Sequence, residues 1–330
     1  MDLITDLEQV APRLGLGHSS VALGMFDGVH RGHQAVLRRA VARARAERLI
    51  SVAFTFDRHP YSIIAPDRVP PLITPTEEKA RLISGLGLDA MVIYPFDETF
   101  ANMSPEDFAA GILKGWLRAS RAVVGYNYTF GRGGTATPEL LKDLGRTLGF
   151  GVDVVGPVNL NGMTVGSTEI RALLLSGDVR SAAGLLGRPF SIRGKVVKGY
   201  GRGSEMGFPT ANIAPPMGVL IPREGVYAVR VLAGDGQQEQ IGVANIGFRP
   251  TFGGRERTIE VYILDFRGDM YGSVITILFI DRIRPEIKFD RWENLRAQID
   301  RDVEVARSIL GDRSNSLDSL NQVIYKDSGL

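Results

Sequence analysis

The stretch that decides the fold runs from residue 20 to residue 48 and reads SVALGMFDGVHRGHQAVLRRAVARARAER. It begins with a short apolar run, 20–25, which is typical of a buried strand. It ends with a long amphipathic segment, 34–48, which is typical of a helix. Paired glycines and two histidines lie between them, where the strand would pass into the helix. A strand followed at once by a helix favours a parallel sheet covered by helices.

The same alternation continues through the first half of the chain. We expect an α/β domain in which helices cover both faces of a parallel sheet. Ser104 before Pro105, and Thr137 before Pro138, are typical pairs at the start of a helix. The further expected strands are 50–56, 90–94, 122–126 and 152–155, and the further expected helices are 76–86, 105–117, 138–148, 168–175 and 179–186.

The pattern changes near residue 187, where β-rich runs separated by turn residues begin. These runs predict a small antiparallel barrel, followed by a helix at 291–310 and a polar tail. The domains are therefore expected at 1–187, 188–310 and, for the tail, 311–330. The expected barrel strands are 190–197, 226–232, 241–246, 258–266 and 274–283.

Composition narrows the class of protein. The 330 residues predict two domains of ordinary size. Cysteine is absent, which excludes disulfides, thiolate metal sites and cysteine nucleophiles. The 39 basic and 37 acidic residues nearly balance, so neither a nucleic acid nor a membrane surface is expected as a partner. An acidic N-terminus and the lack of a long apolar run predict a cytoplasmic protein, and the sequence does not indicate an oligomeric state.

Two of the four histidines, His30 and His33, lie between the first expected strand and helix. A helix start offers backbone N–H groups and a positive dipole end, which suit an anion. Gly28 and Gly32 permit close backbone approach, and imidazoles can donate to phosphoryl oxygens. The alternative is a strand–turn–helix joint with solvent-exposed histidines. The flanking strand and helix and the paired glycines favour the phosphate site.

The segment 26–34, FDGVHRGHQ, resembles the adenylyltransferase half of the bifunctional riboflavin kinase/FAD synthetase family. Its HRGH part resembles the His-x-Gly-His signature of nucleotidyltransferases, which implies a Rossmann-like domain. The resemblance implies that His30 and His33 stabilise the phosphates of ATP while the α-phosphate is attacked. It also implies a nucleotide-binding loop whose residues are Gly24, Phe26, Asp27 and Gly32.

Two further segments resemble the same half of that family. In 55–60, TFDRHP, the resemblance implies that His59 approaches phosphate, although Arg58 stands where proline is commoner. A polar turn residue before proline is the alternative for this histidine. In 124–131, VGYNYTFG, the resemblance implies that Asn127 helps to place the nucleotide or the flavin. The aromatic residues at 126, 128 and 130 could equally be core residues on one strand face.

The segment 166–171, GSTEIR, resembles the Ser-Thr-x-x-Arg motif of that family. The resemblance implies that Ser167 and Thr168 bind the nucleotide and that Arg171 neutralises charge on the triphosphate. A capped helix with a solvated arginine is the alternative, and both interpretations can hold together. The loop 132–135, RGGT, is shorter and less basic than the family pattern, which puts flavin-phosphate contacts from this loop in doubt.

A glycine-rich segment, 198–212, KGYGRGSEMGFPTAN, follows the first expected barrel strand. It lacks the Walker pattern, and no helix follows it as in a Rossmann fingerprint. Its glycines would permit a backbone wrap around phosphate, and a glycine-rich surface turn is the alternative. Thr210 and Asn212 would point the same way in an extended segment. Their oxygens could ligate Mg²⁺.

The PTAN part of this segment resembles the signature of riboflavin kinases, as do the segments 245–252, 265–272 and 283–289. The resemblance implies Thr210 and Asn212 as metal ligands. In 258–264, TIEVYIL, alternation places Glu260 and Tyr262 on one face. A strand glutamate is usually only solvent-facing, but the resemblance implies that Glu260 is the general base on the riboflavin 5′-hydroxyl. The phosphate-binding residues implied are Gly199, Gly201, Gly207 and Pro209.

The resemblance spans residues 15 to 310 and implies two linked activities that use ATP and Mg²⁺. The C-terminal domain would convert riboflavin to FMN, and the N-terminal domain would convert FMN to FAD with release of pyrophosphate. A kinase with an adenylyltransferase weakened at 132–135 is one alternative. A non-catalytic flavin-binding sensor is the other, and the intact His30, Thr210 and Glu260 argue against it.

Overall fold

The computed structural model describes residues 1–9, 15, 17–198, 208–233, 238–251, 254–266 and 268–311. The chain divides into two compact units, Met1–Ser167 and Thr168–Leu330. The division falls after the first residue of α8 (Ser167–Ser176) and before α9 (Val179–Leu186), and both helices precede the expected domain boundary near 187. Among the described residues, no helix is both long enough and apolar enough to span a membrane.

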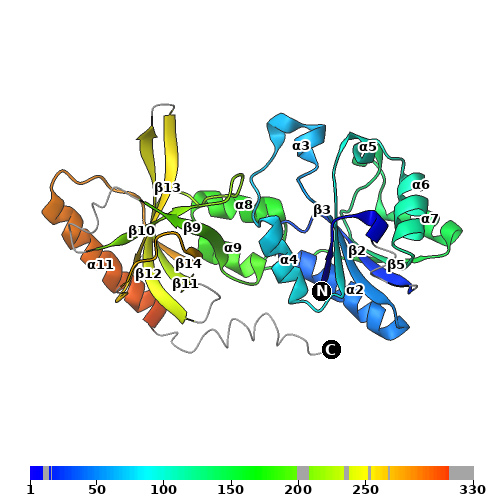
Figure 1. Ribbon diagram of the computed structural model, residues 1–330, viewed down its shortest axis with the longest axis horizontal. Coiled ribbons are helices and arrows are strands. Elements are labelled where there is room, and N and C mark those ends of the chain that lie inside the picture. Colours follow the sequence, from blue (N-terminus) through cyan, green and yellow to red (C-terminus); the bar gives the residue numbers. More distant parts are fainter. Residues whose placement is uncertain are drawn as a thin grey trace. The chain divides into compact units, whose positions relative to one another are not determined.

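The first unit is built on a six-stranded parallel sheet with the order β1-β4-β3-β2-β5-β6 (Figure 1). This confirms the predicted α/β class. The strands are β1 (Asp2–Ile4), β2 (Ser19–Leu23), β3 (Ile50–Phe56), β4 (Ala90–Tyr94), β5 (Ala119–Gly125) and β6 (Gly151–Val155). A separate small hairpin pairs β7 (Asn159–Leu160) with β8 (Met163–Thr164).

Helices connect these strands, and α6 continues directly into η3, which is a π-helix. The α-helices are α2 (Arg31–Glu47), α3 (Tyr61–Ile64), α4 (Thr76–Ser84), α5 (Glu98–Ala101), α6 (Pro105–Asp107) and α7 (Pro138–Leu148). The other helical segments are η1 (Leu7–Gln9), η2 (Pro66–Arg68), η3 (Phe108–Trp116) and η4 (Arg132–Gly134). The Ser104 hydroxyl accepts from the Asp107 N–H at 3.0 Å, as its N-cap position predicts, whereas the Thr137 side chain does not cap α7.

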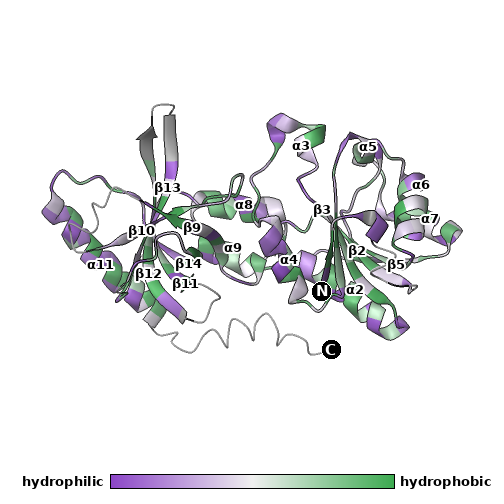
Figure 2. Ribbon diagram, viewed as in Figure 1, coloured by the Kyte–Doolittle hydropathy of each residue, from purple (hydrophilic) through white to green (hydrophobic). Residues whose placement is uncertain are grey.

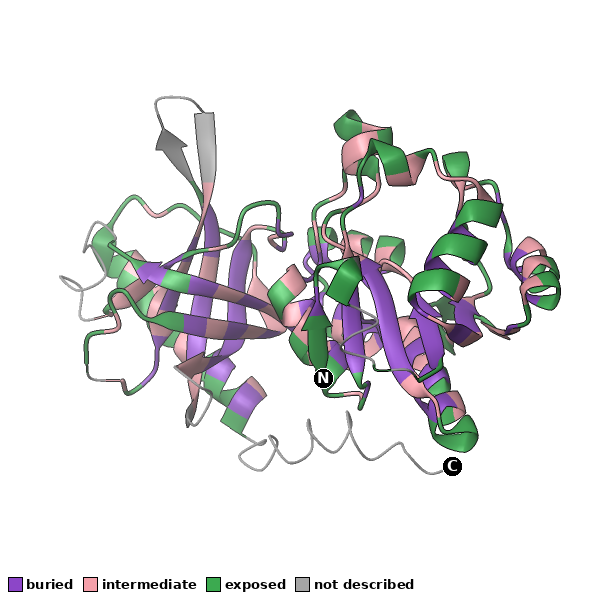
Figure 3. Ribbon diagram, turned by 45° about the vertical axis from the view of Figure 1, so that its right-hand side comes forward, coloured by how far each residue is buried: buried purple, intermediate pink, exposed green. Residues whose placement is uncertain are grey.

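The core of this unit has two layers because side chains of a strand alternate between the faces of a sheet. On β2, Ala22 packs with α2 and α4 on one face, whereas Val21 and Leu23 pack with η3 and α7 on the other. The helices carry apolar stripes toward the sheet (Figure 2), and the central strands are buried (Figure 3). Helices therefore cover both faces, as predicted.

Strand β1 was not predicted from the sequence. It spans only three residues and pairs in parallel with β4. Of its side chains only Ile4 is buried, so the segment carries neither an apolar run nor a complete alternation.

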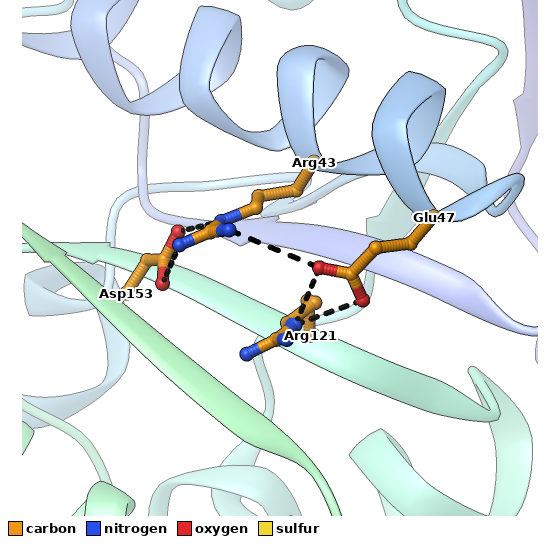
Figure 4. Close-up of polar contacts among 4 residues, drawn as sticks. All are labelled: Arg43, Glu47, Arg121 and Asp153. Carbon is orange, nitrogen blue, oxygen red and sulfur yellow. Dashed lines mark hydrogen bonds and ion pairs between the residues drawn. The ribbon is translucent and has the colours of Figure 1, made fainter.

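An ionic network fastens α2 to β5 and β6 (Figure 4). The Arg43 guanidinium binds the Asp153 carboxylate: its Nε donates to Oδ2, and its Nη2 donates to Oδ1 at 3.1 Å. The Arg121 Nε donates to both Glu47 oxygens at 2.9 and 3.0 Å. Arg121 lies near the amino end of β5, away from the edge where the strands end. These partly exposed pairs contribute little stability each, so we assign the network to fixing the orientation of α2.

The second unit contains a closed barrel in which all neighbouring strands are antiparallel, with the order β10-β13-β12-β11-β14-β9. This confirms the predicted barrel and the terminal helix. The elements are β9 (Phe190–Val197), β10 (Thr210–Ala214), β11 (Gly225–Ala233), β12 (Gln238–Thr251), β13 (Gly254–Ile263), β14 (Val274–Arg284) and α11 (Trp292–Gly311).

Helix α11 is held to the barrel by a buried ion pair. The Arg284 guanidinium on β14 binds Asp302 on α11 with N–O distances of 2.8 to 3.1 Å. The Gln298 amide also donates to Asp302 at 2.9 Å, and Asp302 is 2% exposed. Ala306 and Leu310 add apolar contacts to the barrel wall. The pair therefore fixes the position of the helix along the wall.

We expect Asp302→Ala to lower the free energy of unfolding of the second unit by about 3–5 kcal/mol, because it leaves the Arg284 charge buried without its partner. The measurement is urea unfolding in a Trp116→Phe background, in which Trp292 is the remaining tryptophan. The control is Asp300→Ala at an exposed position of the same helix, expected to change stability by less than about 0.5 kcal/mol. Equal effects of the two substitutions on the free energy of unfolding would contradict the role of the Arg284–Asp302 pair in holding α11 to the barrel.

Candidate active site

The first site lies at the carboxyl ends of three neighbouring strands. Strands β3, β2 and β5 are adjacent and parallel. The segments that contain His30, His59 and Asn127 each begin where one of these strands ends. Parallel strands end along the same edge of a sheet, so the topology gathers the three predicted segments on that edge. Chain order reverses between β2 and β5, and such a switch point is where open α/β sheets bind ligands.

The two histidines are stacked at the start of α2. His30 is the N-cap residue, and its Nδ1 accepts from the His33 backbone N–H at 3.2 Å. The ring centroids are 3.5 Å apart, with an interplanar angle of 18°. Because Nδ1 accepts, the neutral ring of His30 carries its proton on Nε2. His30 is 5% exposed, so the alternative of solvent-exposed histidines does not describe it.

Gly24 and Gly32 permit close packing around the aromatic rings of the loop. A Cβ at Gly32 would lie 3.2 Å from the His30 ring, and a Cβ at Gly24 would lie 2.9 Å from the Phe26 ring. Phe26 is buried, and its ring packs edge-on to His33 with centroids 5.4 Å apart. A side chain at Gly24 would therefore collide with the buried Phe26 ring, whereas one at Gly32 would require the His30 ring to shift by a few tenths of an ångström.

The backbone of this loop is strained. Phe26 and Val29 have φ angles of +52° and +41°, and Gly28 has +88°. Positive φ is unfavourable for a side chain and most of all for a β-branched one. Each such residue costs about 1–3 kcal/mol and persists only where its surroundings hold it. Strain of this kind is typical of functional sites, so it supports the predicted role of the loop.

Asp27 provides part of that support. Its carboxylate is 3% exposed and accepts from the backbone N–H groups of Ile73 and Thr74, each at 3.0 Å. Its carbonyl accepts from the Ser167 hydroxyl at 3.0 Å. The contacts of Asp27 and Ser167, both predicted to bind nucleotide, therefore hold the shape of the loop.

His59 follows β3 in a short turn. Its Nδ1 accepts from the Tyr61 backbone N–H at 3.1 Å, and it is half-buried. The neighbouring Asp57 carboxylate binds Arg58 at 2.9 Å and accepts from the Phe96 N–H at 3.0 Å. Burial opposes ionisation of Asp57, but these contacts outweigh it and lower its pKa. Arg58, which replaces the commoner proline, thus helps to keep a carboxylate ionised beside His59.

The aromatic residues after β5 divide between core and surface. Tyr128 and Phe130 stack in the core with centroids 5.8 Å apart, and burial raises the pKa of Tyr128. Tyr126 and Asn127 are exposed. The three aromatics do not share one strand face, because they lie in the turn that follows the strand. The exposed position of Asn127 is compatible with a ligand contact.

The loop 132–135 forms a compact turn. Phe130 and Ala136 pair across it, and Gly133 and Gly134 both have positive φ angles, +68° and +63°. The Thr135 hydroxyl donates to the Arg132 carbonyl at 3.3 Å. The turn closes on itself, and the effect of its length on flavin-phosphate contacts stays a prediction.

The predicted Ser-Thr-x-x-Arg motif spans the boundary between the units. Ser167 belongs to the first unit and begins α8, whereas Thr168 and Arg171 belong to the second. Thr168 is exposed, and Arg171 is half-buried in the first turn of the helix. Their contact with nucleotide stays a prediction.

In the second unit, three polar residues lie in a row across neighbouring strands. Glu260 on β13 pairs in register with Asn212 on β10 and with Asn245 on β12. The alternation predicted for β13 is confirmed, since Ile259 and Val261 are buried and Glu260 is half-buried. A carboxylate flanked by two amides could accept a proton and hold a hydroxyl in place.

Thr210 and Asn212 lie on the same side of β10, because the segment is extended as the metal-site prediction required. Thr210 is half-buried, Asn212 is 9% exposed, and Pro209 is exposed. Hydroxyl and amide oxygens are hard neutral ligands that suit Mg²⁺, and Glu260 in the same row adds negative charge. The predicted phosphate-binding residues Gly199, Gly201 and Gly207 lie outside the described residues.

Lys79 and Asn245 were missed as candidate site residues. Asn245 had a sequence signal, because it opens the segment 245–252 that resembles riboflavin kinases. Lys79 had none, since a lysine in an amphipathic helix is ordinarily exposed. It is instead 2% exposed, and its Nζ donates to the Met25 carbonyl at 3.2 Å.

Comparisons with known proteins assign a family to each half of the chain. Residues 15–169 match the FAD synthetase family, and residues 186–310 match the riboflavin kinase family. The bifunctional riboflavin kinase/FMN adenylyltransferase of Escherichia coli K12 is 37% identical over 291 residues, covering 88% of this chain and 92% of that protein. The Bacillus subtilis protein of the same name is 37% identical over 294 residues, covering 87% and 91%.

A crystal structure from Streptococcus pneumoniae, described as a macrolide-efflux protein, is 34% identical with a TM-score of 0.83. The match covers 92% of this chain and 98% of that one. Its described role concerns that protein, whereas the two family matches and the bacterial relatives agree on one assignment for both halves. The chain therefore belongs to the bifunctional riboflavin kinase/FMN adenylyltransferase family.

Proposed function

We propose that the two sites described above carry out the two activities of this family in sequence. The chain is a transferase that phosphorylates riboflavin with ATP and then adenylylates FMN with a second ATP. The observation that supports two separate reactions is that one sheet edge of the first unit gathers the segments of His30, His59 and Asn127, whereas the barrel places Asn212 and Glu260 on adjacent strands. The use of ATP in both steps supports the expectation of a cytoplasmic protein, and the expectation of no nucleic-acid or membrane partner rests on the nearly balanced charge.

In the barrel, Glu260 would accept the proton of the riboflavin 5′-hydroxyl. The hydroxyl oxygen then forms a bond to the γ-phosphorus of ATP, and the bond from that phosphorus to the ADP oxygen breaks. The in-register pairing of Glu260 with Asn212 supports this role, because it places base and candidate metal ligand on adjacent strands. Positioning and charge stabilisation dominate phosphoryl transfer, so a base on this row needs only modest strength.

Thr210 and Asn212 would hold Mg²⁺, which would neutralise negative charge on the phosphates of ATP. Neutral oxygen ligands bind this ion weakly on their own, so the nucleotide would supply further ligands. We expect Thr210→Val, which removes the hydroxyl with little change in volume, to raise the Mg²⁺ concentration required for FMN formation by roughly tenfold. Titration with Mg²⁺ at fixed ATP measures it, with Thr276→Val on β14 as the control. An unchanged requirement would contradict the metal assignment.

In the parallel-sheet unit, an FMN phosphate oxygen would attack the α-phosphorus of ATP, and the bond to pyrophosphate would break. His30 and His33 would donate hydrogen bonds to the charge that develops on the phosphates. The free N–H groups and dipole at the start of α2 would act in the same direction. The family resemblance assigns a further positive charge to Arg171, which the chain division places in the second unit. The stacked rings at the switch point of the sheet support this assignment.

A single incubation tests the whole function. The purified chain is mixed with riboflavin, ATP and Mg²⁺, and the flavins are separated by chromatography over time. FMN should appear first and FAD should follow. FMN without FAD would indicate a kinase with an inactive adenylyltransferase, and would direct attention to the loop 132–135. Unchanged riboflavin that still binds the protein would instead support a flavin sensor.

A further inference from the structure

Lys79 is a buried cation that neither proposed reaction uses. It lies in α4 beside the apolar core, with Ile83 buried one turn further along the helix. An ammonium group has three N–H donors and is rarely buried without partners. Lys79 Nζ has three acceptors, namely the Met25 carbonyl at 3.2 Å, the Thr55 hydroxyl at 3.3 Å and the Phe56 carbonyl at 3.3 Å.

These acceptors belong to two of the segments that form the adenylyltransferase site. Met25 immediately precedes Phe26 in the strained loop after β2. Thr55 and Phe56 end β3, directly before the segment that contains His59. The Thr55 hydroxyl also donates to the Met25 carbonyl at 2.9 Å. Lys79 and Thr55 together therefore tie the two segments to each other.

The loop after β2 needs such external support, because backbone strain persists only where surrounding contacts enforce it. The segment that leads into α4 provides a second attachment, since Ile73 and Thr74 donate to Asp27. Lys79 and these backbone groups thus hold the loop on both sides of the strained Phe26, at Met25 and at Asp27.

We propose that Lys79 is a positioning residue for FMN adenylylation: its ammonium group holds the loop 24–33 against the end of β3, so that His30 and His33 are presented to ATP. The inference rests on the proposed role of that loop in adenylylation. Lys79 acts through two backbone carbonyls and a hydroxyl rather than on the reacting atoms.

The charge of Lys79 makes this support dependent on pH. Burial lowers the pKa of Lys79 to about 8, while Asp27 from the loop after β2 and Asp57 from the loop after β3 oppose the shift by attraction. Arg58 binds Asp57, so that carboxylate stays ionised in this range. A neutral amine keeps only two N–H donors for three acceptors. Support of the loop should therefore weaken as the pH rises through about 8.

Two variants, Lys79→Met and Lys79→Arg, separate the effect of the charge from that of the size of the side chain. Lys142→Met, on the exposed side of α7, is the control. At pH 7, Lys79→Met should lower kcat for FAD formation from FMN by at least about tenfold, because small misplacements of a reacting group are costly. FMN formation from riboflavin in the same chain should be unchanged. Lys79→Arg, which stays charged, should retain FAD formation.

The pH profile supplies a readout that a purely structural role would not move. FAD formation by the unchanged chain should decline above about pH 8, and both Lys79→Met and Lys79→Arg should lack that decline. Stability should move the other way. Between about pH 8 and 10.5, Lys79 is neutral in the folded protein but still protonated in the unfolded chain. The free energy of unfolding of the unchanged protein should therefore rise with pH in this range, relative to that of Lys79→Met.

Hydrogen exchange tests the positioning directly and does not depend on activity. Amides of residues 25–29 should exchange faster in Lys79→Met than in the unchanged chain, while those of α7 should not. Unchanged exchange in that loop, or an unchanged pH profile in both variants, would overturn the proposal. An unchanged chain that makes no FAD would contradict the proposed adenylylation itself, and with it the role given to Lys79.

Discussion

Replacing Glu260 by glutamine should lower FMN formation from riboflavin by at least about a hundredfold, because a positioned general base contributes that much or more. The substitution keeps the shape of the side chain and its place between Asn212 and Asn245. FAD formation from added FMN should be unaffected, since none of the residues assigned to that reaction lies on the barrel strands. Initial rates with riboflavin or with FMN as the only flavin substrate distinguish the two effects.

The matched control for Glu260→Gln is Glu304→Gln, at an exposed position of α11 in the same unit. It removes the same charge without touching the polar row on the barrel, so FMN formation should be unchanged. A decline equal to that of Glu260→Gln would mean that net charge rather than a base explains the effect. Retention of full activity by Glu260→Gln would contradict the role of Glu260.

Replacing His30 by asparagine should lower FAD formation from FMN by about 10²- to 10³-fold, the usual effect of removing one donor that stabilises developing charge. Asparagine is itself a good N-cap residue, so the start of α2 should remain stable while the imidazole is lost. FMN formation from riboflavin should continue, and FMN should accumulate. The measurement is the initial rate of FAD formation at saturating FMN and ATP.

His18→Asn is the control for this substitution. His18 is exposed and lies next to the amino end of β2, opposite to the edge where the candidate site lies. The change in chemistry is identical, but neither activity should fall. If His30→Asn made FAD as fast as the unchanged chain, the histidine pair would have no part in the chemistry.

Much of this architecture is predictable from the sequence, for a physical reason. Buried parallel strands are continuous apolar runs, and antiparallel strands alternate, so both patterns are visible without coordinates. The alternation around Glu260 correctly placed Ile259 and Val261 in the core. Asn245 could have been added by the same reasoning, had the register between β12 and β13 been known.

The support of the adenylyltransferase loop could not be predicted in this way. Phe26 and Val29 adopt positive φ angles although neither residue favours them, and only long-range contacts hold them there. One of those contacts comes from Lys79, fifty-four residues from Met25 in sequence. The family resemblance placed Asp27 among the nucleotide- and phosphate-binding residues, and that role stays a prediction. The sequence did not indicate that its carboxylate also accepts from two backbone N–H groups of a distant segment.

The most direct test of the account mixes the two inactive variants. Glu260→Gln alone should leave riboflavin unchanged, and His30→Asn alone should stop at FMN. A mixture of the two, supplied with riboflavin, ATP and Mg²⁺, should make FAD, because FMN released by one variant is adenylylated by the other. If either variant lost both activities, or if the mixture made FMN but no FAD, the assignment of the two reactions to two separate sites would be contradicted.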